Sequence, residues 1–208
     1  MTSATFLHPR IVIAFAIAPL CLSFAASAQA TFTDQGASIL GGLNVSGRSA
    51  SLADIDKDGD LDLFFQGGGS SSQKLLRNNV IGTGTHTFTD ISSTALPSGL
   101  TESWSAAWGD YDGDGMIDVF VGQSNSGTNT GDLLKNNGAA GFSNVSVATG
   151  LNDAAFHQNV AWADIDHDRD LDLLIGMEGP EKHQIYLQGP ASHFTPVGAA
   201  TGVQQDFG

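Results

Sequence analysis

Three acidic stretches decide the fold: ADIDKDGDLDLFF at residues 53–65, GDYDGDGMIDVFV at residues 109–121 and ADIDHDRDLDLLI at residues 163–175. Their first aspartates are Asp54, Asp110 and Asp164, so the pattern recurs after 56 residues and again after 54. A fixed period of this length is typical of repeat architectures, in which each repeat forms one supersecondary unit. The sequence therefore predicts three copies of one structural unit.

The sequence around each acidic stretch repeats as well. Each first aspartate is preceded, at a distance of 22 residues, by a short F-[TS]-[DN] segment that begins at Phe32, Phe88 or Phe142. After each stretch comes a strand-like run with an amide end, at residues 75–79 (LLRNN), 133–137 (LLKNN) and 186–188 (YLQ). Chance could supply one DxDxDG sequence, but it would not supply three in register with matching flanks.

The runs of β-branched and apolar residues within each repeat are short. Gly, Asn and Ser bound them, and no stretch shows sustained helical periodicity. In the second repeat we expect four strands, near residues 103–110, 116–122, 131–135 and 141–145. A unit of about 55 residues with four antiparallel strands suits a β-propeller blade. The sequence therefore predicts an all-β fold of propeller blades, with blade motifs near residues 48–90, 103–145 and 157–196.

The spacing D-x-D-x-D-G-x-x-D favours a bound calcium ion. It places carboxylates at loop positions 1, 3, 5 and 9 and a backbone carbonyl at position 7, and calcium takes six to eight oxygen ligands in a flexible geometry. The three loops hold 14 of the 22 acidic residues, and carboxylates this close repel one another without a cation. The predicted ligands are Asp54, Asp56, Asp58, Asp60 and Asp62; Asp110, Asp112, Asp114, Met116 and Asp118; and Asp164, Asp166, Asp168, Asp170 and Asp172, with position 7 contributing its carbonyl.

Other interpretations of these loops have to be weighed. An EF-hand loop begins with the same residues, but it ends in a bidentate Glu at position 12 and runs between helices. Here position 12 is Phe65, Val121 or Ile175, and a strand-like run surrounds it. Zinc is disfavoured because the loops offer no sulfur ligand and a single imidazole, that of His167. A solvated acidic turn without metal stays open as the alternative.

The third loop differs from the other two at position 6. Gly59 and Gly115 occupy this sharp turn in the first two loops, and Arg169 occupies it in the third. A residue other than Gly with positive φ costs about 1–2 kcal/mol, and the guanidinium adds positive charge beside the cation. We therefore predict two to three calcium ions, with a structural role at the corner of each blade.

These motifs resemble the FG-GAP/VCBS repeat family, whose blades occur in integrin α-subunit propellers and in many exported bacterial proteins. The resemblance rests on W-[GA]-D-x-D-x-D-[G]-x-x-D-[LV] at residues 108–119 and 162–173, where the first repeat has Leu52 in place of Trp, and on the two flanking segments. It covers residues 31–208. The resemblance implies propeller blades, calcium in the loops, and a role in adhesion or ligand binding, and Arg169 departs from its pattern. Trp108 and Trp162 are expected to pack between blades.

Residues 1–30 are expected to form a secretory signal peptide. They contain no acidic residue, and their apolar run at residues 11–24 is shorter than the ~20 residues that span a bilayer. Small residues at positions 26–30 fit a signal-peptidase site, and an uncleaved anchor is the alternative. The single cysteine, Cys21, lies in this segment, which excludes an internal disulfide framework. We expect residues 31–208 to be exported to the periplasm, the cell surface or the medium.

The overall charge limits the classes of partner. The 208 residues carry 22 acidic and 8 basic side chains, a formal net charge of −14. That balance disfavours nucleic-acid binding and attachment to anionic lipid through a polybasic patch. After residue 30 no apolar run is long enough to span a bilayer. We expect a non-catalytic protein that binds a protein or glycan ligand, and the alternative is an accessory propeller of a secreted enzyme such as a polysaccharide lyase.

The number of repeats bears on how the blades are completed. Phe194 begins a fourth F-T segment, and the acidic loop expected 22 residues later would lie beyond Gly208. Three blades and a stub cannot close a ring, because propellers have about 4–8 blades. The sequence therefore predicts a partial propeller, with the remaining blades encoded beyond residue 208 or supplied by association.

Overall fold

The computed structural model describes residues 33–40, 43, 47–67, 73–100, 102–123, 131–151, 157–177 and 183–197. The expected signal peptide at residues 1–30 lies outside the described residues, and so does the expected stub after residue 197. Contacts divide the chain into two units, residues 1–34 and 35–208. All the elements below belong to the second unit.

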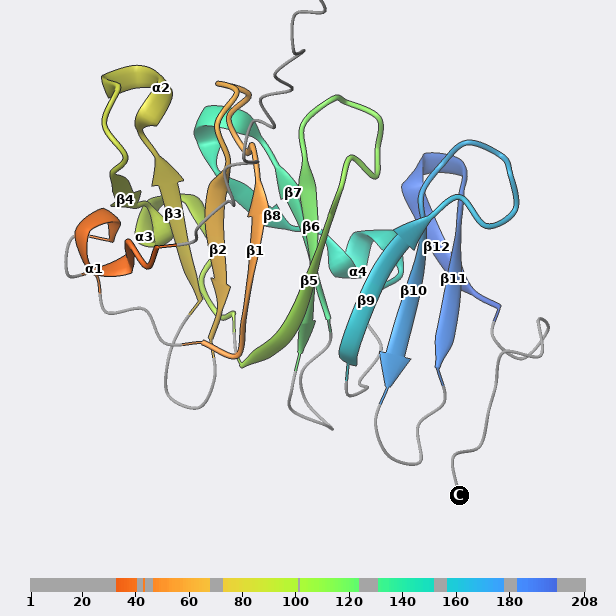
Figure 1. Ribbon diagram of the computed structural model, residues 1–208. Helices are drawn as coiled ribbons and strands as arrows, with labels where there is room; N and C mark the ends of the chain where they lie inside the picture. The colour runs from red at the N-terminus through yellow and green to blue at the C-terminus, as the bar shows by residue number, and fades with distance from the viewer. Residues whose placement is uncertain are drawn as a thin grey trace, which may run out of the picture. The chain divides into compact units, whose positions relative to one another are not determined.

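Three four-stranded antiparallel sheets follow one another along the chain (Figure 1). The first contains β1 (Ser49–Ala53), β2 (Asp62–Gln66), β3 (Lys74–Asn78) and β4 (Phe88–Asp90). The second contains β5 (Ser103–Gly109), β6 (Asp118–Gln123), β7 (Asp132–Asn136) and β8 (Phe142–Asn144). The third contains β9 (His157–Ala163), β10 (Asp172–Met177), β11 (Gln184–Gly189) and β12 (His193–Pro196). The expected all-β fold of four-stranded, blade-like sheets is confirmed.

Short helices of a single turn lie in the connections before and between the strands. They are α1 (Gly36–Ile39), α2 (Val80–Thr83), α3 (Ser92–Ala95) and α4 (Ser146–Thr149), with 3₁₀ turns η1 (Gly138–Ala140) and η2 (Pro190–Ser192). Within the described residues, no helix is long and apolar enough to cross a bilayer.

The F-[TS]-[DN] segments at Phe88 and Phe142 form the fourth strands of the first and second sheets, β4 and β8, and begin the next turn. Asp90 Oδ1 accepts a hydrogen bond from Ser92 N at 3.0 Å, and Ser92 Oγ in turn accepts one from Leu75 N at 2.9 Å. The turn after the fourth strand is thereby tied to the third strand. The second sheet repeats this arrangement with Asn144, Ser146 and Leu133. The fourth F-T segment, at Phe194, forms β12 and so completes the third sheet.

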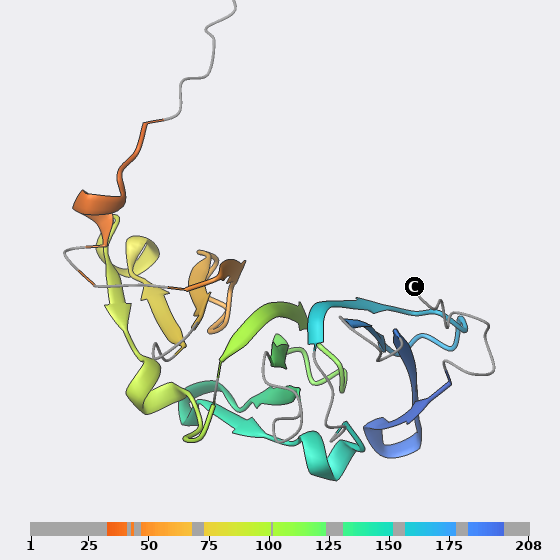
Figure 2. The ribbon, with the colours of Figure 1, turned by 90° about the horizontal axis from the view of Figure 1, so that it is seen from below.

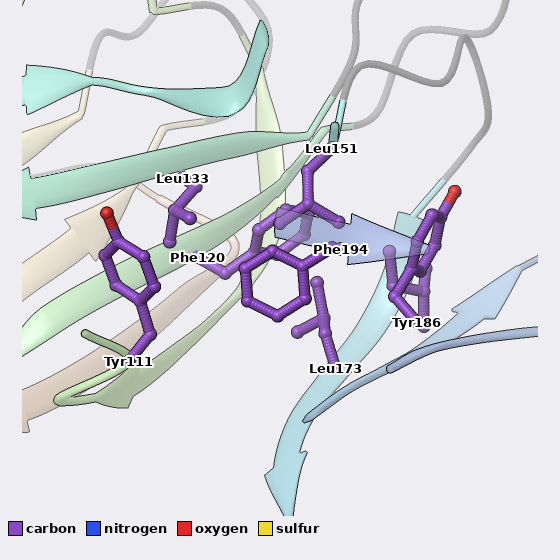
Figure 3. Close-up of a cluster of buried hydrophobic side chains, with 8 residues drawn as sticks. Tyr111, Phe120, Leu133, Leu151, Leu173, Tyr186 and Phe194 are labelled. Carbon is purple, nitrogen blue, oxygen red and sulfur yellow. The ribbon is translucent and has the colours of Figure 1, made fainter. Parts of the chain in front are cut away.

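Each pair of neighbouring sheets shares an apolar core. Successive residues of a strand point to opposite faces, so Val119 and Val121 of β6 face the first sheet while Phe120 faces the third. The first core contains Ala53, Ile55, Phe64, Leu75, Val119, Val121, Leu134 and Phe142. The second contains Tyr111, Phe120, Leu133, Leu151, Leu173, Ile175, Tyr186 and Phe194 (Figure 3).

One tryptophan of the second sheet and one of the third each bind to the preceding sheet through the indole N–H. Trp108 donates from Nε1 to Ser51 Oγ at 2.9 Å, and Trp162 donates from Nε1 to the Ala107 carbonyl at 3.0 Å. Their rings also pack edge-on against the preceding sheet, at Phe64 and Phe120. Packing between blades, as expected for these tryptophans, is what the structure shows. Leu52, which replaces the Trp in the first sheet, is 53% exposed.

Two side-chain amides repeat the same connection near the loops. Asn136 donates from Nδ2 to the Ile55 carbonyl at 2.8 Å, and Gln188 donates from Nε2 to the Tyr111 carbonyl at 3.0 Å. Each bond joins the third strand of one sheet to the acidic loop of the preceding sheet. The first strand of each sheet lies next to the first strand of the neighbouring sheet, since β5 contacts β1 and also β9 (Figure 2). The first and second acidic loops are therefore part of the contacts between sheets.

Candidate metal centre

Each acidic loop joins the first strand of a sheet to the second strand. The loops cover residues 54–61, 110–117 and 164–171, and an antiparallel pair of strands flanks each of them. Helices on either side, which the EF-hand interpretation required, are replaced by strands in all three described loops. The EF-hand alternative is therefore excluded.

Two positions of every loop have left-handed backbone conformation. At position 6, φ is 95° for Gly59, 84° for Gly115 and 83° for Arg169, as expected from the sequence. At position 4, φ is also positive, at Lys57, Gly113 and His167. The second loop meets both requirements with glycine, whereas the third meets neither. Because a left-handed residue other than Gly is strained, the third loop carries the largest backbone cost.

Backbone N–H groups orient the carboxylates within each loop. Asp54 accepts from Asp58 N at 3.1 Å and from Gly59 N at 3.0 Å, and Asp110 accepts from Gly115 N at 2.9 Å. The carboxylate at position 5 accepts from the N–H at position 7 in all three loops. Asp and Asn side chains favour such local bonds in turns. The backbone of each loop thereby folds around the carboxylates of the same loop.

Among the residues that the structure describes, three triads of aspartates could hold a metal ion, because one carboxylate oxygen from each member lies within 4.8 Å of the others. Positions 1 and 3 take part in every triad, together with position 5 in the first loop or position 9 in the second and third. The triads are Asp54, Asp56 and Asp58; Asp110, Asp112 and Asp118; and Asp164, Asp166 and Asp172. The other predicted carboxylate ligands, Asp62, Asp114 and Asp168, lie outside these triads.

The donor set fits a hard cation such as calcium. Asp110 Oδ1 and Asp164 Oδ1, both at position 1, are buried and have no hydrogen-bond partner in the described part of the chain. A buried anionic oxygen without a donor is costly, and a cation removes that cost. Asp60 Oδ1 and Asp170 Oδ1, at position 7, are likewise buried without a hydrogen-bond partner in the described part of the chain. The oxygen-only ligands match those that calcium prefers.

The aspartate at position 9 has a structural connection that the sequence did not reveal. Asp118 accepts from Tyr111 N at 3.3 Å and from Asn136 N at 2.7 Å, so it joins the start of its loop to the third strand of its sheet. Asp62 and Asp172 make the equivalent pairs of bonds. The available signal was its place at the start of a strand between apolar neighbours, as in LDL and IDV.

Burial changes the acidity of these groups. Desolvation raises the pKa of Asp62 and of Asp118 to about 6, although their two backbone hydrogen bonds act in the opposite direction. Asp118 is fully buried and Asp62 nearly so. In the third loop, desolvation and the neighbouring Asp168 raise the pKa of Asp170 to about 6. The loops therefore concentrate negative charge that the protein alone compensates poorly.

A comparison with models of protein families agrees with this geometry. A family model described as FG-GAP-like repeat matches residues 67–121 and 110–175, a region that contains the second and third acidic loops. The two matches together extend over residues 67–175, which is more than half of the chain. A comparison with curated proteins gave no match. From the repeated loops, the three four-stranded sheets and this match, we conclude that the chain belongs to the FG-GAP-like repeat family.

Proposed function

We propose that the chain is a calcium-binding repeat protein in which calcium stabilises the corner of each sheet. One observation carries this proposal: each loop gathers three carboxylates within 4.8 Å, and the second and third loops each leave a buried position 1 oxygen without a hydrogen-bond donor. The carboxylates at positions 1, 3, 5 and 9 and the carbonyl at position 7 would hold the ion. Bound calcium would supply the positive charge that offsets their repulsion.

The function that we propose for the whole chain is to bind a protein or a glycan, without catalysis. Three equivalent acidic sites, each at the same corner of a sheet, suit a structural ion, whereas a catalytic centre is normally built once. The alternative is an accessory role in a secreted enzyme such as a polysaccharide lyase. A catalytic domain elsewhere in the same gene product would favour that alternative.

We also propose export, with the mature chain beginning near residue 31. Extracellular calcium modules bind with Kd values of about 10⁻⁴–10⁻³ M, so sites of this kind suit the periplasm, the cell surface or the medium better than the cytosol. Mass spectrometry of the chain recovered after secretion would locate its first residue. Recovery of an intact N-terminus inside the cell would contradict export.

A further repeat is proposed to cover the third sheet. Phe64 and Phe120, at equivalent positions of β2 and β6, are each 1% exposed because the next sheet packs on them. Leu174, at the same position of β10, is 38% exposed, and Ile165, at position 2 of the third loop, is also 38% exposed. This apolar face is covered in the first two sheets and exposed in the third. A blade whose next neighbour is absent would expose such a face.

The calcium role can be tested by thermal unfolding with calcium and with chelator. At ten times Kd, each occupied site stabilises the folded state by about 1.4 kcal/mol, so we expect a clear rise in Tm with calcium. Asp112→Ala should reduce that rise. Asp34→Ala, which removes the same charge outside the loops, should leave it intact. An identical Tm in calcium and in chelator would exclude the proposed structural role.

The binding role needs a separate test. The chain would be immobilised and exposed to panels of glycans and of extracellular proteins, with calcium and with chelator. We expect binding that depends on calcium, because the ion would hold the sheets that present the surface. Binding of a glycan that a catalytic domain of the same gene product cleaves would instead favour the enzyme alternative.

A further inference from the structure

Lys135 brings a positive charge into the second loop. It lies on β7, and its ammonium group donates to Asp112 Oδ2 and, at 2.8 Å, to Asp114 Oδ2. These carboxylates occupy positions 3 and 5, where calcium ligands are expected. The two hydrogen bonds hold the pKa of Lys135 well above its ordinary value, and the same contact lowers the pKa of Asp114. The lysine therefore compensates charge that calcium would otherwise compensate.

The chain offers two comparisons for this position. Asn78, Asn136 and Gln188 each donate their backbone N–H to the position 9 aspartate of their own sheet. The preceding residues, which are Arg77, Lys135 and Leu187, are therefore structurally equivalent. Burial raises the pKa of Asp56, and the positive charge of Arg77 acts against that rise, whereas Leu187 carries no charge at all. The three loops thus differ in a cation supplied from the third strand.

We propose that Lys135 is a tethered cation, which neutralises the second loop when calcium is absent and must leave for calcium to bind. This inference rests on the proposed calcium-binding function. A divalent ion and an ammonium group on the same carboxylates repel each other strongly at a separation of a few ångströms. The ammonium group can move away from the two carboxylates, because the lysine side chain is 28% exposed and its four-carbon stem is flexible.

Two consequences follow for the second loop. Its backbone is the least strained of the three, because both left-handed positions are glycines, yet the lysine weakens its affinity for calcium. The metal-free loop is also held together by the lysine, so calcium adds less stability there. Lys135 therefore sets both the affinity and the calcium dependence of this site.

The test compares the full chain with Lys135→Leu, which installs the side chain found at position 187. Calcium titration by calorimetry would be combined with terbium luminescence in chains that also carry Asp164→Ala, which weakens the third loop. Trp108 and Tyr111 then sensitise terbium at the second loop, whereas the first loop has Leu52 and Ile55 at these positions. We expect calcium binding at the second loop to become about tenfold tighter and the Tm in chelator to fall. Lys74→Leu removes a lysine that pairs with Asp90 outside the loops, and it should leave the affinity unchanged.

Leu187→Lys is the reciprocal variant, and it keeps the test decisive if Lys135→Leu does not fold. It should weaken calcium binding at the third loop by a similar factor. Unchanged or weaker calcium binding at the second loop of Lys135→Leu would overturn the tethered-cation role while the calcium function stands. Binding by Lys135→Leu but not by the unmodified second loop would support the role in its strongest form. Absence of binding in both chains would overturn the role together with the proposed function.

Discussion

At the scale of single residues, the position 9 aspartates act on the backbone as well as on charge. Asp118 accepts two N–H groups that belong to different elements, one at the start of its loop and one on β7. A buried N–H that loses its acceptor costs about 1–3 kcal/mol. This role does not need a metal ion, which separates it from the role of the exposed carboxylates at position 5.

Replacement of Asp118 by Ala should therefore destabilise even the metal-free protein. We expect a loss of about 3 kcal/mol in the free energy of unfolding, measured by urea denaturation in chelator at pH 5.5, where the Asp118 carboxyl is largely protonated. Asp114→Ala is the matched control. Asp114 forms a partly exposed ion pair with Lys135, and such pairs contribute about 0–1 kcal/mol. Equal losses in the two variants would argue against the backbone role of Asp118.

Arg169 permits a second prediction at this scale. Its φ of 83° is strained for any residue with a Cβ, so Arg169→Gly should increase the free energy of unfolding by about 1 kcal/mol. It should also tighten calcium binding at the third loop, because a positive charge is removed. Gly59→Ala tests the same backbone position in reverse, since a Cβ there meets no atom within 4 Å. Destabilisation by Arg169→Gly in urea would show that the arginine makes a compensating contact.

The sequence predicted position 6 correctly because two of its three residues are glycine. It did not reveal the left-handed backbone at position 4, where Lys57 and His167 are ordinary residues and only Gly113 gives a signal. The backbone bonds of Asp118 were equally hidden, because they depend on how β7 is aligned with the loop. Local spacing predicts which oxygens can meet an ion, but not which N–H groups reach them across a sheet.

At the scale of elements, the strands of the second sheet lie within two residues of their predicted bounds. Short apolar runs between turn residues were sufficient for that prediction. The four-residue helices were missed because a single turn has no periodicity to detect. One of them, α3, is joined to the third strand by the bond from Leu75 N to Ser92 Oγ, a contact between residues 17 apart that a local pattern does not reveal.

The start of the second strand gives the metal-free sheets an unusual pH dependence. Asp62 begins β2 and Asp118 begins β6, and burial raises both pKa values from 3.8 to about 6. The folded state therefore binds these protons more tightly than the unfolded chain does. Their contribution to stability is fully present below about pH 4 and is lost as the pH rises through 6. In chelator, stability should fall between pH 4.5 and pH 7.

Urea unfolding at several pH values would measure this effect. The double replacement Asp62→Asn and Asp118→Asn should flatten the profile in chelator, because neither amide titrates. With saturating calcium, the ion favours the ionised carboxylates, so the calcium-dependent gain should grow as the pH rises from 5 to 7.5. Stability in chelator that rises with pH through this window would mean that other groups dominate the titration.

At the scale of the whole molecule, each sheet buries its apolar side chains against the sheets next to it in the chain. The face of the first sheet that carries Phe64 is covered by the second, and the face of the second that carries Phe120 is covered by the third. The sequence predicted the number and order of the repeats, and it placed Trp108 and Trp162 between them. It could not predict the amide bonds from Asn136 and Gln188 to the preceding loops, since these cross between repeats that lie far apart in the chain.

Adjacent leucines of β10 test how much a buried side chain depends on the sheet that covers it. Leu173 is fully buried against the second sheet, whereas Leu174 points to the opposite face and is 38% exposed. Leu173→Ala should cost about 2–5 kcal/mol, the usual range for a buried leucine, and Leu174→Ala should cost less than about 1 kcal/mol. The substitution and the strand are the same, so only the covering sheet differs. Equal losses, measured by urea unfolding at several protein concentrations, would show that the face of Leu174 is covered in solution. A dependence of that loss on concentration would then identify a second copy of the chain as the cover, because only association responds to mass action.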